Sequence, residues 1–292
     1  MQPSSYPLPE REVTVDFSNL VQNMLPKTHL TVFLLALGIF LPFSLATAFG
    51  SELPERIVLR HLETFPHDTR AFTQGLFWHD GFLYESTGLY GESSLRRVEP
   101  TTGRVTARID LPPQFFGEGI ALAGDSLFML TWRENVCFVF DKRTFQLTGR
   151  FQYPGEGWGL TYDGTHLIKS NGSNELRFLD PRTFRQVRRV SVTDSTQNRR
   201  ASPVRNLNEL EWIRGEVWAN VWQTTRIVRI NPRNGNVIGW IEMAPFVPEE
   251  HRGDTQNAVL NGIAFDPETN HVYITGKLWD AMHKFLLEVP EQ

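Results

Sequence analysis

Five side chains of four types stand at one equivalent position of an internal repeat, and their types could do chemistry. In chain order they are Gln74, Glu118, Trp158, Asn208 and Asn261. A carboxyl group among amides and an indole could bind a small polar group and move a proton, because apolar surroundings raise the pKa of a carboxyl toward neutrality. A purely architectural position would tend to repeat one residue type. The alternative is that the five side chains only solvate a wet channel.

A second group of candidate residues follows the next expected strand of the same repeat. Its members are Trp132, Trp222 and Lys277. Together with the first group they would give a pocket with apolar walls and a few fixed polar groups, which is the usual anatomy of a small-ligand site. The alternatives are that Trp side chains pack between repeats, as we expect for Trp78, Trp212 and Trp218, and that Lys277 is a solvated surface residue.

The repeat that must position these residues occurs five times. Its copies are 44, 40, 50 and 53 residues apart, taking as equivalent Gly75, Gly119, Gly159, Glu209 and Gly262. The copies contain short strands separated by turns that include Asp-Gly, Asn-Pro and Asp-Pro, which is typical of an all-β chain. A unit of four strands needs about 40–45 residues. We therefore expect the surplus in two insertions, 191–205 and 244–259.

These copies predict a five-bladed β-propeller. The fifth copy has room for only about three strands before the C-terminus, whereas an unassigned apolar strand, 56–62, precedes the first copy. Because the ring must close, we expect this N-terminal strand to complete the fifth blade. The innermost strand of each blade would line the central channel, so one repeat position would place five side chains around one mouth.

Composition and missing motifs exclude several classes of function. The 292 residues are 40% hydrophobic and 21% charged, and their formal charge of −4 provides no strong field for nucleic acid or an anionic membrane. A single cysteine, Cys137, rules out an intramolecular disulfide and any site that needs two thiolates. The sequence contains no GxSxG, HExxH, P-loop or dinucleotide motif, and its eight His show no short-spaced pair. We therefore expect neither a metal nor a cofactor.

The N-terminal segment has the pattern of an export signal. An apolar stretch over 30–45 follows Lys27 and precedes Ala-Thr-Ala at 46–48, a small-x-small cleavage pattern. Residues 1–48 are thus predicted to be a signal segment, and 49–292 the propeller domain. An exported chain with one cysteine does not rely on disulfides, which suits a bacterial periplasm best, with secretion as the other possibility.

Two questions stay open at this end of the chain. Residues 1–23 could be an extension ahead of a start at Met24, since they are long and partly acidic for a signal. An uncleaved membrane anchor is the alternative to cleavage. Pro42 and a span of only about 16 strongly apolar residues weaken it, because spanning takes about 20.

Several longer motifs contain the candidate residues. They are FTQGL at 72–76, ESTGLYG at 85–91, FGEG at 116–119, LTW at 130–132, GWGL at 157–160, LNELE at 207–211, ANVW at 219–222, LNGIA at 260–264 and TGK at 275–277. Read together over residues 56–288, they resemble the plant and bacterial type of glutaminyl-peptide cyclotransferase, the glutamine cyclotransferase family. That family is a five-bladed propeller, unrelated to the zinc-dependent animal enzymes of the same activity.

The resemblance implies an acyl-transfer reaction, in which the N-terminal Gln of a peptide or protein cyclises to pyroglutamate and releases ammonia. The α-amine of the substrate attacks its own γ-carboxamide carbon, so the protein needs only to position the substrate, move protons and stabilise an oxyanion. Glu118 would be the proton shuttle, and Lys277 would sit near the oxyanion or the following peptide carbonyl. The substrate would be held or walled by Phe72, Gln74, Phe116, Trp132, Trp158, Asn208, Trp222 and Asn261.

Two rival functions remain. The main one is a non-catalytic exported propeller whose channel binds a peptide or a sugar, and it would tolerate Gln in place of Glu118. The other is a quinone- or metal-dependent periplasmic enzyme, which the absence of clustered His or paired carboxylates disfavours. In the enzymatic case we expect a monomer with no nucleic-acid partner and no stable membrane association after signal cleavage.

Overall fold

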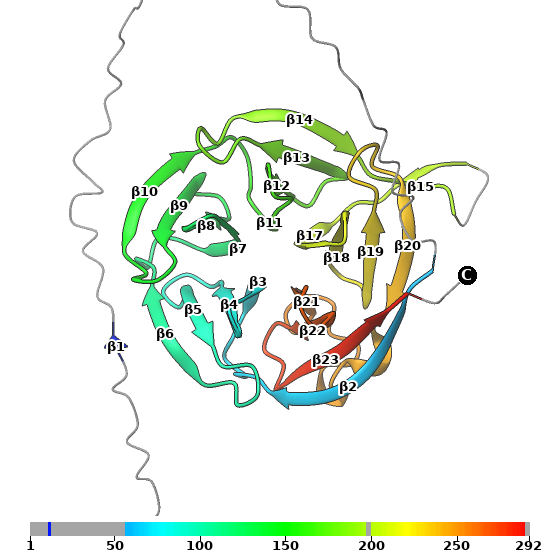
Figure 1. Cartoon of the computed structure of the whole chain (residues 1–292), viewed down its shortest axis with the longest axis horizontal. Helices are drawn as coiled ribbons and strands as arrows, with labels where there is room; N and C mark the ends of the chain where they lie inside the picture. The colour runs from blue at the N-terminus through cyan, green and yellow to red at the C-terminus, as the bar shows by residue number, and fades with distance from the viewer. Residues whose placement is uncertain (1–10, 13–55, 197–199, 290–292) are drawn as a thin grey trace, which may run out of the picture.

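The computed structural model describes residues 11–12, 56–196 and 200–289. Five of its six sheets surround a central axis and the sixth is a two-stranded hairpin, so the predicted all-β, five-bladed propeller is confirmed (Figure 1). Apart from β1 (Arg11–Glu12), which pairs in parallel with β6, the predicted signal segment lies outside the described residues. Within the described residues, no helix is long and apolar enough to span a membrane.

Each blade is an antiparallel meander of four strands. Blade 1 contains β3 (Thr73–His79), β4 (Phe82–Thr87), β5 (Ser94–Val98) and β6 (Val105–Asp110). Blade 2 contains β7 (Gly117–Ala123), β8 (Ser126–Thr131), β9 (Val136–Asp141) and β10 (Leu147–Gln152). Blade 3 contains β11 (Leu160–Tyr162), β12 (Leu167–Lys169), β13 (Glu175–Leu179) and β14 (Gln186–Ser191). Blade 4 contains β17 (Leu207–Ile213), β18 (Glu216–Val221), β19 (Arg226–Ile230) and β20 (Val237–Glu242).

Blade 5 closes the ring as expected. It joins three C-terminal strands to one N-terminal strand, in the order β21 (Leu260–Asp266), β22 (His271–Gly276), β23 (Ala281–Glu288) and β2 (Val58–Pro66). Figure 1 shows the blue β2 lying along the red β23, and the antiparallel register runs from Val58 opposite Glu288 to Pro66 opposite Ala281. The closing strand extends four residues beyond the predicted range 56–62, because its pairing with β23 continues to Pro66.

Both predicted insertions are present. The first contains the short hairpin of β15 (Thr193–Asp194) and β16 (Ser202–Pro203), and the second contains two 3-10 turns, η2 (Ala244–Phe246) and η3 (Glu249–His251). The second insertion connects the outer strand of blade 4 to the inner strand of blade 5.

The hydrophobic core is divided among the interfaces between neighbouring blades. Separate clusters of buried side chains fill these interfaces, one of them containing Trp218 of blade 4 and Ile263 of blade 5. Trp78 stacks on Tyr273 across the junction of blades 1 and 5, with ring centroids 5.0 Å apart. Trp212 packs against the cluster between blades 3 and 4. The expectation that Trp78, Trp212 and Trp218 pack between blades is therefore confirmed.

The repeat position after each candidate ring residue serves the close approach of the inner strands. A Cβ on Gly119 would lie 2.5 Å from the backbone nitrogen of Leu160 in the next blade, closer than real contacts allow. Blade 4 has Glu209 there instead. Its buried carboxylate accepts backbone hydrogen bonds from Leu76 at 3.4 Å and Ile263 at 3.0 Å, and so ties blade 4 to blades 1 and 5.

Candidate functional site

Strand direction brings both groups of candidate residues to one end of the channel. Gln74, Glu118, Asn208 and Asn261 lie at the starts of inner strands, and Trp158 lies two residues before one. The second strand of each blade runs antiparallel and therefore ends at the same rim, where Trp132, Trp222 and Lys277 follow β8, β18 and β22. Phe72 and Phe116 directly precede β3 and β7 at this rim.

Gln74 and Glu118 form the buried polar centre of the site. The Gln74 Nε2 donates a hydrogen bond to Glu118 Oε1 at 3.3 Å. Both residues are buried, with exposed fractions of 3% for Gln74 and 4% for Glu118. Among the described residues, neither Glu118 Oε2 nor Gln74 Oε1 has a hydrogen-bond partner. Buried polar atoms are normally paired, so this pair offers two free acceptors to a ligand with N–H groups.

Burial and nearby charges shift the pKa values of the two titrating groups of the centre, Glu118 and Lys277. Burial raises the pKa of Glu118 well above its usual value, the charge of Lys277 opposes that rise, and the carboxylates of Glu156 and Glu134 add to it. Burial also lowers the pKa of Lys277 to about 8, against the attraction of Glu118. Lys277 is only 5% exposed, so the alternative that it is a solvated surface residue is wrong.

Half-buried aromatic rings enclose the polar centre on two sides. Phe116 meets Phe72 edge-on with centroids 6.2 Å apart, and Trp132 at 5.5 Å. The Lys277 ammonium lies 4.6 Å from the Phe72 ring centroid, which orients it toward this wall. The packing needs Gly88, because a Cβ there would lie 2.3 Å from the Phe116 ring.

The other wall consists of two Trp side chains from adjacent blades. Trp158 and Trp222 meet edge-on with ring centroids 5.6 Å apart. All five predicted aromatic site residues therefore lie along one rim, in two groups of touching rings. Such walls exclude water and strengthen electrostatic interactions inside the site.

Glu156 joins the two walls, and sequence reasoning missed it. Its Oε2 accepts hydrogen bonds from the indole nitrogens of Trp132 at 3.0 Å and Trp158 at 2.9 Å. Arg133 holds the other oxygen at 3.2 Å, and the Lys169 ammonium donates to the Glu156 backbone carbonyl at 2.6 Å. The sequence signal that could have found it is its place two residues before Trp158, inside the glycine-rich segment 155–159.

The two predicted Asn ligands are more deeply embedded than the aromatic residues. Asn261 is fully buried, and its Nδ2 donates to the Thr73 carbonyl at 2.9 Å, joining blade 5 to blade 1. Its Oδ1 has no partner among the described residues. The Asn208 carbonyl accepts a hydrogen bond from Ser170 Oγ at 2.7 Å, which fixes its backbone. Contact of either side chain with substrate stays a prediction.

A buried ion-pair network supports the blade 1 side of the site. Glu85 on β4 accepts a hydrogen bond from Thr73 Oγ1 at 2.7 Å and pairs with both His67 and Arg96. These partners overcome the cost of burial and hold the pKa of Glu85 far below its usual range. Because Thr73 directly precedes Gln74, the network fixes the backbone that presents Gln74.

Metal ligands do not gather anywhere in the described part of the chain. Residues 56–196 and 200–289 contain no group of three or more His, Cys, Asp or Glu side chains that could hold a metal ion. The carboxyl groups of the site instead face hydrogen-bond donors, rings and one lysine.

Comparison with known proteins decides the family. The sequence profile of the family described as glutamine cyclotransferase matches residues 34–287. The chain belongs to the glutamine cyclotransferase family. It is 40% identical over 260 residues to the glutaminyl-peptide cyclotransferase of Arabidopsis thaliana, an alignment that covers 85% of this chain and 78% of the plant protein.

The fold comparison agrees with this membership in the glutamine cyclotransferase family. The crystal structure of the Myxococcus xanthus glutaminyl cyclase superposes with a TM-score of 0.72 at 35% identity. The match covers 82% of this chain and all of the Myxococcus chain. The resemblance carried by the motifs between residues 72 and 277 is thus confirmed at the level of family and fold.

Proposed function

We propose that this chain is a glutaminyl-peptide cyclotransferase, an acyl-transfer enzyme that converts the N-terminal Gln of peptides to pyroglutamate and ammonia. The observation that carries the proposal is Glu118: buried, with a raised pKa and one free oxygen, held between Gln74 and the charge of Lys277. Membership in the glutamine cyclotransferase family and the name of the Arabidopsis relative support the same activity.

Glu118 is the proton shuttle in this mechanism. The substrate α-nitrogen forms a bond to its own γ-carboxamide carbon, and the bond from that carbon to the amide nitrogen then breaks. Glu118 takes the proton that the α-nitrogen loses and delivers it to the departing nitrogen, which leaves as ammonia. A pKa raised toward the working pH suits a group that must both accept and donate a proton.

The neighbours of Glu118 supply positioning and charge. Gln74 presents an amide to the substrate's own polar groups, and Lys277 supplies positive charge where the carbonyl oxygen becomes an oxyanion. The two aromatic walls, one of Phe72, Phe116 and Trp132 and the other of Trp158 and Trp222, keep water from the reacting atoms. The nucleophile is part of the substrate, so the reaction needs no nucleophilic side chain of the protein and no covalent intermediate with it.

The cellular setting is part of the proposal. The apolar stretch and the Ala-Thr-Ala pattern at 46–48 favour export of residues 49–292 to a periplasm or outside the cell, where we expect the protein to be a monomer. Fractionation of expressing cells and N-terminal sequencing of the recovered protein test this; recovery from the membrane fraction with residues 30–45 intact would favour the anchor instead.

The decisive experiment measures ammonia. Purified 49–292 is incubated with a Gln-initiated dipeptide, and ammonia release is followed together with loss of the free amine by mass spectrometry. The N-acetylated dipeptide is the matched control, because its blocked nitrogen cannot attack. Binding of the dipeptide without ammonia release would favour the non-catalytic propeller.

A further inference from the structure

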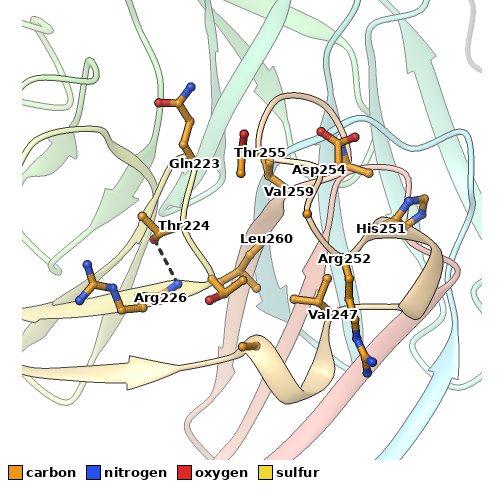
Figure 2. Close-up of a pocket in the computed structure, with 14 residues that line it drawn as sticks. Gln223, Thr224, Arg226, Val247, His251, Arg252, Asp254, Thr255, Val259 and Leu260 are labelled. Atoms are coloured by element: carbon orange, nitrogen blue, oxygen red, sulfur yellow. Dashed lines mark hydrogen bonds between the residues drawn. The ribbon is translucent and has the colours of Figure 1, made fainter.

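A cavity of about 550 Å³ lies beside the site, between blades 4 and 5 (Figure 2). One wall is the loop 223–226 between β18 and β19, and the other is formed by residues of the insertion 244–259 with Leu260. Neither the family resemblance nor the reaction mechanism above uses this cavity.

The cavity opens on the same face as the site. The loop after β18 carries Trp222, and Gln223, the next residue, lines the cavity. On the other side Leu260 lines the cavity and directly precedes Asn261. The backbone N–H of Lys277 donates to the Val259 carbonyl at 2.9 Å, so the floor of the cavity is hydrogen-bonded to the segment that presents Lys277.

The buried part of the lining is apolar, whereas polar side chains that include Arg226, His251 and Arg252 line the rest. Val247, Ala258, Val259 and Leu260 are buried residues of the wall, with Thr255 exposed near the opening. The Asp254 carboxylate is fully engaged by the loop itself: it accepts backbone hydrogen bonds from residues 256, 257 and 258 at 2.8 to 3.0 Å. The insertion is therefore braced internally.

We propose that this cavity is a subsite for a bulky apolar side chain on the second, third or fourth residue of the peptide substrate. The inference rests on the proposed function. The first residue of the bound peptide reacts at the buried centre, so the residues that follow it must extend across the open rim. An extended chain advances about 3.3–3.6 Å per residue. A cavity that starts one residue from Trp222 and Asn261 is within reach of the next few positions.

The test compares glutamine amide with peptides of four residues that begin with Gln and carry Ala, Leu, Phe or Asp at each later position in turn. The wild-type protein should show a kcat/KM about tenfold higher for Leu or Phe at one of these positions than for Ala or Asp, the range that pocket contacts supply. Thr255→Trp should fill the cavity from an exposed position and abolish this preference, while glutamine amide reacts as before.

Matched variants separate the subsite from general damage. Gln256→Trp changes the adjacent exposed residue, which does not line the cavity, and should leave both substrate classes unaffected. Thr255→Glu should shift the preference from Leu toward Lys at the same peptide position. Wild-type kcat/KM values that do not depend on the later residues would overturn the subsite, as would an equal loss on glutamine amide in Thr255→Trp. Absence of ammonia from glutamine amide itself would instead overturn the proposed function.

Discussion

Gln74 and Glu118 come from the inner strands of adjacent blades and meet through a hydrogen bond of 3.3 Å between Nε2 and Oε1. The reacting centre is therefore assembled across a blade interface. Ser86 in blade 1 also donates from its Oγ to the Glu118 backbone carbonyl at 2.6 Å. A site built this way depends on the ring being closed and on both strands keeping their register.

The first prediction concerns Glu118→Gln, which keeps the shape of the side chain and removes its titrating proton. General acid–base catalysis contributes about 10²–10⁴-fold, so kcat should fall by that factor with KM little changed. The Gln side chain can still accept the hydrogen bond from Gln74, and the thermal melting temperature should stay close to that of the wild type. A folded variant with near-normal turnover would show that Glu118 is not the shuttle.

The second prediction concerns the buried charge of Lys277. Its pKa is lowered from 10.5 to about 8 by burial, so between these values the unfolded chain binds the proton that the folded protein has released. The folded protein is therefore most stable with respect to this group above pH 10.5, where the lysine is neutral in both states. Its free energy of unfolding decreases as the pH falls toward 8, because the folded state must then bury a charge. Lys277→Met removes that dependence.

Thermal melts of wild type and Lys277→Met measure this effect. At pH 7 the variant should melt at a higher temperature than the wild type, and the difference should shrink as the pH rises from 8 toward 10.5. Activity should be lost at every pH, because the charge near the oxyanion is gone. A pH-independent difference in melting temperature would contradict a buried, titrating Lys277.

The sequence could predict the architecture because each blade repeats one strand pattern and the ring has to close. Gln74 and Glu118 could be predicted as site residues for the same reason, because side chains at one repeat position meet at one mouth of the channel. Glu156 was not, because its role depends on two indole N–H groups that come from different blades and point to one oxygen. Nor could the sequence show that Asn261 spends its amide donor on the Thr73 carbonyl.

The third prediction tests Glu156 as a positioning residue. Glu156→Ala removes the shared acceptor of Trp132 and Trp158, and hydrogen bonds to a charged group contribute about 1.5–3 kcal/mol. The pocket walls should loosen, raising KM about tenfold with a smaller effect on kcat, and the intrinsic Trp fluorescence should shift. Arg133→Gln is the control, because it leaves both indole hydrogen bonds in place and should change KM far less. Equal effects of the two variants would argue against a positioning role for the carboxylate.

The pH dependence of kcat/KM distinguishes a charge effect of Glu156 from a loss of packing. Its negative charge contributes to the raised pKa of Glu118. Glu156→Gln should therefore move the Glu118 limb of the kcat/KM profile to lower pH, whereas Arg133→Gln keeps the Glu156 charge and should leave that limb in place. The full pH–rate profiles of the two variants provide the comparison.

The fourth prediction concerns metals. The attacking nitrogen belongs to the substrate, and Glu118 with Lys277 can manage the proton and the developing charge. Activity should therefore survive prolonged treatment with EDTA or a heterocyclic zinc chelator followed by desalting. Inactivation that zinc reverses would point to a metal-dependent mechanism.

The fifth prediction links ring closure to catalysis. A chain starting at Asp68 lacks β2, which leaves β23 as an unpaired edge in the blade that carries Asn261 and Lys277. It should aggregate and release no ammonia, whereas a chain starting at Ser51 should behave like 49–292. The chain starting at Asp68 also loses the contact of His67 with Glu85 at 3.0 Å. A chain starting at His67 keeps this contact and lacks only β2, so it separates the two effects and should fail in the same way. Soluble yield, a thermal melt and the ammonia assay compare the four proteins; a soluble, active protein starting at Asp68 would show that β2 is dispensable for closing the site.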